Sequence, residues 1–213
     1  MTSGAYTPPA PAPGGSKIDI AVLASGSGTN LQALLDSPTV RPHITIVISD
    51  KPEAGALRRA RDVGVHTAVI RWEDHGDRDS FSTAVADAVE AAGAKGVVLA
   101  GFMRLLAPSF IDRFPDRILN IHPSLLPSFP GARAVASALD HGVAVTGVTV
   151  HFVDEEVDHG PIVAQVPVEV EDRDTVDTLH ARLQIEEHRL YPRVVEALVQ
   201  GRLVVEGRRV RWR

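Results

Sequence analysis

The feature that most constrains the fold of this chain is a regular alternation of short apolar runs with amphipathic stretches. Between residues 17 and 121, runs with the character of strands occupy 17–24, 44–50, 65–70, 95–102 and 117–121. Helical patterns separate these runs, at 29–36, 53–64, 77–93 and 107–114. Strands that alternate with helices form right-handed βαβ units, so we predict an α/β fold with an open, mostly parallel sheet and helices on both faces.

The pattern changes in the second half of the chain. Two long apolar runs, at 144–153 and 161–170, are separated only by the sequence DEEVDHG, which is too short for a crossover helix. We therefore predict that these two strands pair antiparallel, as a wide hairpin added to the sheet. A long helical pattern over 174–200, interrupted near Pro192, and a small terminal hairpin around a Glu-Gly pair follow.

Length and composition indicate one globular domain. The chain has 213 residues, of which 44% are hydrophobic and 23% charged, as in an ordinary soluble protein. Residues 1–16 consist mainly of Pro, Ala, Gly and Ser and lack the charged-then-apolar pattern of a signal peptide. We expect a disordered tail over 1–16, a single domain over 17–213 and a cytoplasmic location.

Several function classes are disfavoured by what the sequence lacks. The net charge is −5 and no long basic run occurs, so nucleic-acid binding has no electrostatic support. The absence of cysteine excludes a disulfide framework, a thiolate metal site and a cysteine nucleophile. No apolar run approaches the roughly 20 residues of a membrane span.

The first candidate site is the glycine-rich stretch ASGSGTN at 24–30, directly after the first strand. Gly26 and Gly28 let the backbone approach a ligand closely, and the following helix offers free N–H groups that suit a phosphate. The stretch is neither a dinucleotide fingerprint, because position 31 is Leu, nor a P-loop, because no Gly-Lys-Ser/Thr follows. The alternative is a simple turn whose Ser, Thr or Asn caps the helix.

The second candidate site is the pair Asn120 and His122, at the end of the fifth strand. Residues two apart on a strand point to the same side, so an amide donor and an imidazole lie together there. Prolines at 123, 127 and 130 predict a stiff, extended loop that holds them still. Such a pair suits the oxyanion that forms when a carbonyl becomes tetrahedral. The alternative is a buried histidine beside a turn-forming asparagine.

The third candidate site is the acidic stretch VDEEVDHGP at 153–161. We expect Glu155 and Glu156 to lie in a solvated turn, whereas Asp158 starts a returning strand and is able to face His122. A metal site would combine His122, His151, Asp158 and His159. Their spacing fits no standard metal motif, so no metal is expected.

A fourth signal lies in the long helix. Its apolar stripe comprises Val176, Leu179, Leu183, Leu190, Val194 and Leu198. Position 187 belongs to the same stripe by helical spacing, yet it is Glu. An inward carboxylate beside Pro192 needs a partner, which is either an arginine of the chain or a hydroxyl of a ligand.

Five segments together carry a resemblance to a known family. They read SGSGTNLQALLD, VVLAGFMRLLAPSF, LNIHPSLLPSFPG, GVTVHFVDEEVDHGPIVAQ and RLQIEEHRLYP. In this order and spacing they resemble the folate-dependent formyltransferases, and most closely those of purine biosynthesis. The resemblance runs from about Ile18 to the last hairpin. It implies the formyltransferase fold, which is Rossmann-like.

The resemblance implies a reaction and a catalytic trio. The amino group of glycinamide ribonucleotide attacks the formyl carbon of 10-formyltetrahydrofolate, which serves as co-substrate without a metal. The family's catalytic residues fall on Asn120, His122 and Asp158. Asn120 and protonated His122 would stabilise the oxyanion, while Asp158 would keep His122 protonated and relay the proton of the amine.

The resemblance also implies the substrate contacts. The ribonucleotide positions are Gly28, Thr29, Asn30, Leu31, Gln32, Gln184 and Glu187. The folate positions are Arg78, Met103, Arg104, Leu105, Leu106, Asn120, Asp154, Glu155, Glu156, Val157 and Asp158. This chain departs from the family after FPG, where many relatives carry histidines and residues 132–137 read ARAVAS. Acceptor contacts from Arg133 to Ser137 do not carry over with the resemblance.

Rival members of the same superfamily are distinguished by chain length and charge. Methionyl-tRNA formyltransferase carries an extra C-terminal tRNA-binding domain, and formyltetrahydrofolate hydrolase an N-terminal regulatory domain. At 213 residues and net charge −5 we expect neither here. The hydrolase, transfer to another amine, and a binding module without catalysis remain the alternatives. The expected partners are small-molecule substrates, with no nucleic acid or membrane and with a homodimer left open.

Overall fold

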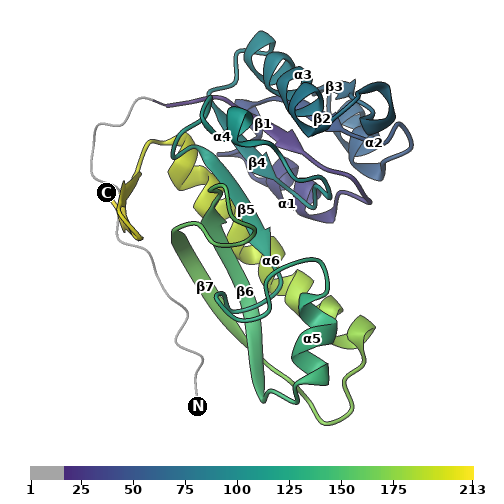
Figure 1. Cartoon of the computed structure of the whole chain (residues 1–213). Helices are drawn as coiled ribbons and strands as arrows, with labels where there is room; N and C mark the ends of the chain where they lie inside the picture. Colours follow the sequence, from purple (N-terminus) through teal and green to yellow (C-terminus); the bar gives the residue numbers. More distant parts are fainter. Residues whose placement is uncertain (1–16) are drawn as a thin grey trace.

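The computed structural model describes residues 17–213, which form one nine-stranded sheet with helices on both faces (Figure 1). The disordered tail expected over 1–16 lies outside the described residues. The strands are β1 Ile20–Leu23, β2 Ile44–Ser49, β3 His66–Val69, β4 Gly96–Leu99, β5 Ile118–His122, β6 Val145–Phe152, β7 Ile162–Glu169, β8 Leu203–Glu206 and β9 Arg209–Trp212. The α-helices are α1 Thr29–Asp36, α2 Gly55–Asp62, α3 Arg78–Ala91, α4 Pro108–Ile111, α5 Ala134–Asp140 and α6 Val176–Val199, and 3-10 turns span Arg41–His43 and Trp72–Asp74.

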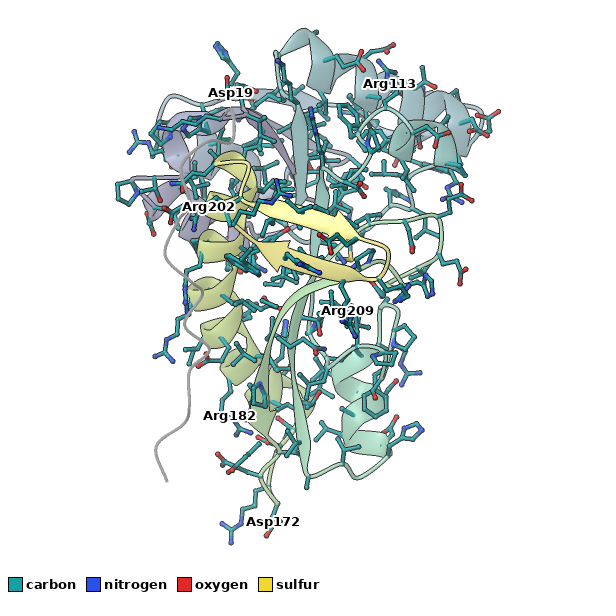
Figure 2. The ribbon with its side chains drawn as sticks, turned by 90° about the vertical axis from the view of Figure 1, so that its left-hand side faces the viewer. Asp19, Arg113, Asp172, Arg182, Arg202 and Arg209 are labelled. Atoms are coloured by element: carbon teal, nitrogen blue, oxygen red, sulfur yellow. The ribbon has the colours of Figure 1, made fainter. Side chains whose placement is uncertain are left out.

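The strand order is β3-β2-β1-β4-β5-β6-β7-β9-β8. Strands β1 to β5 are parallel, whereas β6 pairs antiparallel with β5 and β7 antiparallel with β6. The terminal hairpin β8–β9 joins β7 through a single parallel pair and lies beside the end of α6, where Figure 2 labels Arg202 and Arg209. The predicted mostly parallel sheet with an antiparallel C-terminal part is confirmed.

Two hydrophobic cores sandwich the sheet. Helices α1, α2, α5 and α6 pack on one face, and α3 and α4 on the other. In β1 the side chains of Ile20 and Val22 enter the first core, while Ala21 and Leu23 enter the second. Because both faces are covered, the central strands are apolar at almost every position, which explains the continuous apolar runs.

The predicted interruption of the long helix near Pro192 is wrong. Helix α6 is continuous from Val176 to Val199 and begins with a capping box between Thr175 and Thr178. Buried side chains on both sides of Pro192 pack against the sheet, and this packing outweighs the backbone hydrogen bond that proline removes. The prediction that Val176 belongs to the buried stripe is also wrong, because it is 45% exposed.

The carboxyl ends of the parallel strands meet at one edge of the sheet. From β1 to β3 the strands are added toward one edge of the sheet, and from β4 onward they are added toward the other edge. The strand order therefore reverses between β1 and β4, which are neighbours in the sheet. Loops after β1, β2, β4 and β5 therefore converge where α/β proteins bind ligands. Within residues 17–213 no helix is long and apolar enough to cross a membrane.

Candidate active site

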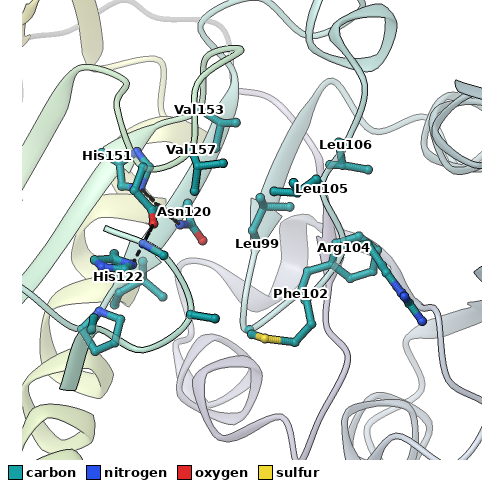
Figure 3. Close-up of a pocket in the computed structure, with 18 of the residues that line it drawn as sticks. Leu99, Phe102, Arg104, Leu105, Leu106, Asn120, His122, His151, Val153 and Val157 are labelled. Atoms are coloured by element: carbon teal, nitrogen blue, oxygen red, sulfur yellow. Dashed lines mark hydrogen bonds and ion pairs between the residues drawn. The ribbon is translucent and has the colours of Figure 1, made fainter. Parts of the chain in front are cut away.

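A cavity of about 680 Å³ opens at this edge of the sheet (Figure 3). Its walls are the loops after β4, β5 and β6, the first residue of α3, and parts of α5 and α6. It is lined by all the residues predicted for catalysis and folate binding: Arg78, Met103, Arg104, Leu105, Leu106, Asn120, His122, Asp154, Glu155, Glu156, Val157 and Asp158. The cavity thus brings together four segments that the sequence analysis treated separately.

Asn120 and His151 are direct partners across strands β5 and β6. Their side chains project from the same face of the sheet, and the Asn120 amide nitrogen lies 3.1 Å from Nε2 of His151. The Nδ1 atom of His151 lies 2.7 Å from the carbonyl oxygen of Phe152 and donates to it. Nε2 of His151 therefore faces both the Asn120 amide and the carboxylate of Asp158, whose Oδ1 lies 3.6 Å away.

His122 is held between two hydrogen-bond acceptors. Its Nε2 lies 2.9 Å from the carbonyl oxygen of Phe129, and its Nδ1 lies 3.3 Å from Oδ2 of Asp158. Nε2 therefore donates to the Phe129 carbonyl, while Nδ1 lies within ion-pair distance of the Asp158 carboxylate. The expected position of Asp158 opposite His122 is confirmed by this distance.

The proline-rich loop after β5 is free of helix and strand and is tied to β6 and β7. Thr149 of β6 donates to the carbonyl oxygen of Ser124 at 2.6 Å and accepts from the Leu126 amide at 3.1 Å. Gln165 of β7 donates to the Leu126 carbonyl at 2.9 Å. Phe129 has a φ of 55°, and its carbonyl oxygen faces His122. The loop therefore fixes one of the two acceptors around the imidazole.

Asp158 lies in a tight return between β6 and β7. Its φ is 53°, a left-handed conformation that Asp tolerates better than most residues. Gly160 passes so close to β6 that an added Cβ would lie 1.9 Å from the carbonyl oxygen of Phe152. Only glycine fits there, and the resulting turn directs Asp158 toward the Gly131 amide, which donates to Oδ2 at 2.7 Å.

The carboxyl of Asp158 is held in its ionised form. Burial raises its pKa, but hydrogen bonding from His151 and Gly131 and the charge of His122 outweigh this effect. The net result is a pKa below the ordinary value of 3.8. Both hydrogens of the Asn120 amide nitrogen are engaged by this cluster, because it also donates to Oδ1 of Asp158 at 3.3 Å.

The alternative metal site is not assembled. His159 turns to Asp154, with Nδ1 at 2.8 Å from the carboxylate, and its carbonyl oxygen accepts from Arg208 at 2.6 Å. It therefore does not join His122, His151 and Asp158. Among residues 17–213 no group of three or more His, Asp or Glu side chains is placed to hold a metal ion.

The predicted ribonucleotide residues lie outside the large cavity. Thr29 and Gln32 line a second cavity of about 410 Å³, together with Arg59 and His188. No side chain caps helix α1, whose N-cap is Gly28 with a φ of 76°, so the capped-turn alternative is wrong. The side chain of Leu31 is fully buried, which leaves only its backbone to contact a ligand.

Glu187 has a partner that the sequence analysis did not consider. It is 5% exposed, and its Oε2 accepts from the side-chain amide of Asn30 at 2.8 Å. Of the two alternatives, the arginine partner is wrong, because the partner within the chain is Asn30. The bond joins α6 to the first turn of α1, so two segments predicted to share one ligand are in direct contact.

A family model described as formyl transferase matches residues 18–195, which is well over half of the chain. The chain belongs to the formyl transferase family. Phosphoribosylglycinamide formyltransferase of Mycobacterium tuberculosis (strain CDC 1551 / Oshkosh) is 44% identical, over 89% of this chain and 88% of that protein. Glycinamide ribonucleotide transformylase 1 from Symbiobacterium toebii superposes with a TM-score of 0.89 and 49% identity, over 92% of this chain and 94% of that one.

Another relative is much longer than this formyl transferase chain. The trifunctional purine biosynthetic protein adenosine-3 of Bos taurus is 44% identical over 92% of this chain. The chain spans only 20% of the length of that relative. The similarity therefore concerns one part of the bovine protein.

Sequence reasoning missed some residues of this formyl transferase site. His151 was considered only as a metal ligand, although it bonds Asn120 and lies 3.6 Å from Asp158. One signal was present, since His151 is the one ionisable residue in strand β6, Val145–Phe152. The carbonyl of Phe129 and the amide of Gly131 carry no side-chain signal, because backbone groups are placed by the path of the loop alone.

Proposed function

We propose that this chain transfers the formyl group of 10-formyltetrahydrofolate to the amino group of glycinamide ribonucleotide. The products are formylglycinamide ribonucleotide and tetrahydrofolate. The observation that carries the proposal is the position of His122, held between an ionised Asp158 and a backbone carbonyl and next to Asn120 in a ligand-sized cavity. The names of the relatives from Mycobacterium tuberculosis and Symbiobacterium toebii support the choice of acceptor.

The cluster is suited to the addition of an amine to a formyl carbonyl. As the nitrogen attacks, the carbonyl oxygen becomes an oxyanion, which the His122 cation stabilises at short range. Asn120 contributes by exchanging its long 3.3 Å bond to Asp158 for a bond to the oxyanion. Asp158 accepts a proton from the attacking amine, and the proton passes to the folate nitrogen as the carbon–nitrogen bond to the folate breaks.

The two substrates are proposed to approach from different sides of the cluster. The folate occupies the large cavity, whose mouth exposes the apolar side chains of Met103, Leu105 and Val157. The ribonucleotide phosphate binds the free amides at the start of α1. Its ribose hydroxyls reach Glu187, which is already oriented by Asn30.

The proposal is tested by supplying 10-formyltetrahydrofolate with each acceptor separately and following the release of tetrahydrofolate. We expect turnover with glycinamide ribonucleotide and none with methionyl-tRNA or without an acceptor. Comparable kcat/KM with methionyl-tRNA would reassign the chain to another transferase. Folate turnover without any acceptor would identify a hydrolase.

A further inference from the structure

Asp50 is a buried carboxylate whose role the reaction described above does not explain. It directly follows strand β2 and its side chain is fully buried. Its Oδ2 accepts from Nε of Arg104 at 2.8 Å. A carboxylate without contact to water is costly unless a cation pairs with it, so the Asp50–Arg104 pair has a specific reason to exist.

A second contact restrains the same arginine. The guanidinium carbon of Arg104 lies 5.4 Å from the centroid of the Trp72 ring. Trp72 in turn packs edge-on against Phe81, with ring centroids 5.3 Å apart, and Phe81 is fully buried in the second core. Arg104 is thus held at one edge by a carboxylate and on one side by an aromatic ring.

The remaining edge of Arg104 is available to a ligand. Neither terminal nitrogen of its guanidinium has a hydrogen-bond partner among residues 17–213, and the side chain is 33% exposed. Arg104 lines the large cavity on the side opposite His122, as Figure 3 shows. A guanidinium fixed through Nε presents its terminal N–H groups in the planar geometry that matches a carboxylate.

We propose that Asp50 and Trp72 are positioning residues that fix Arg104 to receive a carboxylate of the folate glutamyl tail. This inference rests on the proposed function, because only a folate places its reacting carbon at His122 and an anionic tail elsewhere in the same cavity. Asp50 acts through Arg104 rather than on the ligand. The guanidinium of Arg104 neutralises the charge of Asp50 and lies between that charge and the proposed position of the anionic tail.

The test compares two ligands that differ only in the glutamate, tetrahydrofolate and tetrahydropteroate, by calorimetric titration of the full chain. In Asp50→Asn we expect the Kd for tetrahydrofolate to rise about threefold to tenfold, because Arg104 loses its fixed orientation. The Kd for tetrahydropteroate stays unchanged. Trp72→Leu should likewise raise the Kd for tetrahydrofolate alone, and it replaces Asp50→Asn as the test variant if Asp50→Asn does not fold.

The chain offers a closely matched control. The side chain of Asp174 is also nearly inaccessible, at 2% exposed, and pairs with Arg182 at 2.5 Å, while the Arg182 side chain is 29% exposed. Figure 2 labels Arg182 on the part of α6 remote from the terminal hairpin. Asp174→Asn removes a comparable ion pair and should leave both Kd values unchanged. A similar rise in this control would show that the effect is general destabilisation, and would overturn the inference.

A double-mutant cycle with Arg104→Gln decides whether Asp50 acts through Arg104. Once Arg104 is replaced, Asp50→Asn should no longer change the Kd for tetrahydrofolate. A full additional loss, or tighter binding in the Asp50→Asn single variant, overturns the inference. Equal Kd values of the unaltered protein for the two ligands would overturn the inference too, even if the protein transfers the formyl group. Failure of the proposed function is distinct, since it would appear as turnover with methionyl-tRNA or without an acceptor, while the preference for tetrahydrofolate over tetrahydropteroate would persist.

Discussion

Asp158 organises the proposed catalytic cluster because its two oxygens face different groups. Oδ1 accepts from Asn120 at 3.3 Å and lies 3.6 Å from His151, while Oδ2 lies 3.3 Å from His122 and accepts from the Gly131 amide at 2.7 Å. One carboxylate therefore orients both the amide and the imidazole. Removal of its charge should affect the reaction more than the fold.

We expect Asp158→Asn to lower kcat by a factor of about 10²–10⁴, the usual range for a positioned acid–base group. An amide neither favours a protonated His122 nor accepts a proton from the amine. Steady-state kinetics with both substrates measure the loss, and the far-ultraviolet circular dichroism of the variant should match that of the unaltered protein. Near-normal kcat contradicts the mechanism, and activity restored by a divalent metal would indicate a metal site instead.

The ionisation of Asp158 also predicts a pH dependence. Its pKa in the folded chain is below the ordinary value of 3.8, so its contribution to stability is fully present above that value. The contribution is lost as the pH falls through the lower, folded pKa. The difference in thermal midpoint between the unaltered protein and Asp158→Asn should therefore be constant from about pH 7 to pH 5 and shrink only below about pH 4. A difference that already vanishes at about pH 6 would contradict this assignment.

At the scale of elements, helix α6 is connected to the strands that carry the site. Tyr191 is fully buried, and its hydroxyl donates to the carbonyl oxygens of Leu99 and Leu119 at 2.8 and 3.2 Å. Burial and the charge of Glu187 raise its pKa well above the ordinary value, so the hydroxyl keeps its proton. Leu119 precedes Asn120, so the helix anchors the strand end that carries this proposed catalytic residue.

Tyr191→Phe should lower the free energy of unfolding by about 1–3 kcal/mol, because it leaves two buried carbonyl groups without this donor. Urea denaturation at neutral pH measures the change, and an unchanged m-value would show that the denatured state is unaffected. A loss within about 0.5 kcal/mol would mean that water replaces the hydroxyl.

The elements themselves were largely predictable, and the exceptions have a physical cause. The strands and helices follow from apolar periodicity, which burial on one or both faces imposes directly. The break predicted at Pro192 is absent. The local rule for proline predicts it, but the packing of Tyr191 and Val194 against the sheet stabilises the helix across this position. Local signals locate an element, but its continuity depends on contacts that are distant in sequence.

At the scale of the molecule, the site joins segments that lie far apart in the chain. Motifs identified Asn120, His122 and Asp158, because each stands out from its surroundings. The pairs Asn120–His151 and Asp50–Arg104 depend on strand register and on the convergence of loops. A single sequence does not reveal such pairs, since neither partner is near the other in the chain.

The arrangement of the whole molecule predicts that a substitution at one substrate site weakens the binding of that substrate and leaves the binding of the other unchanged. Glu187 lies on α6 and contacts Asn30 of α1, and it does not line the large cavity. Glu187→Ala should therefore raise the KM for glycinamide ribonucleotide about tenfold or more, the effect of losing a charged hydrogen bond. The KM for 10-formyltetrahydrofolate should change less than about twofold, as steady-state kinetics with each substrate varied in turn would show.

Two further variants separate binding from structure. Glu187→Gln keeps the shape of the side chain and an acceptor for Asn30, so its KM for the ribonucleotide should lie between those of the unaltered protein and Glu187→Ala. Glu186→Ala removes a neighbouring carboxylate whose partner is Arg189, at 2.7 Å, and should change neither KM. If both KM values stay unchanged in Glu187→Ala, the carboxylate serves only to join α6 to α1. An equal rise in both values would instead mean that the two substrate sites are not independent, because the α1–α6 contact would then support the folate cavity as well.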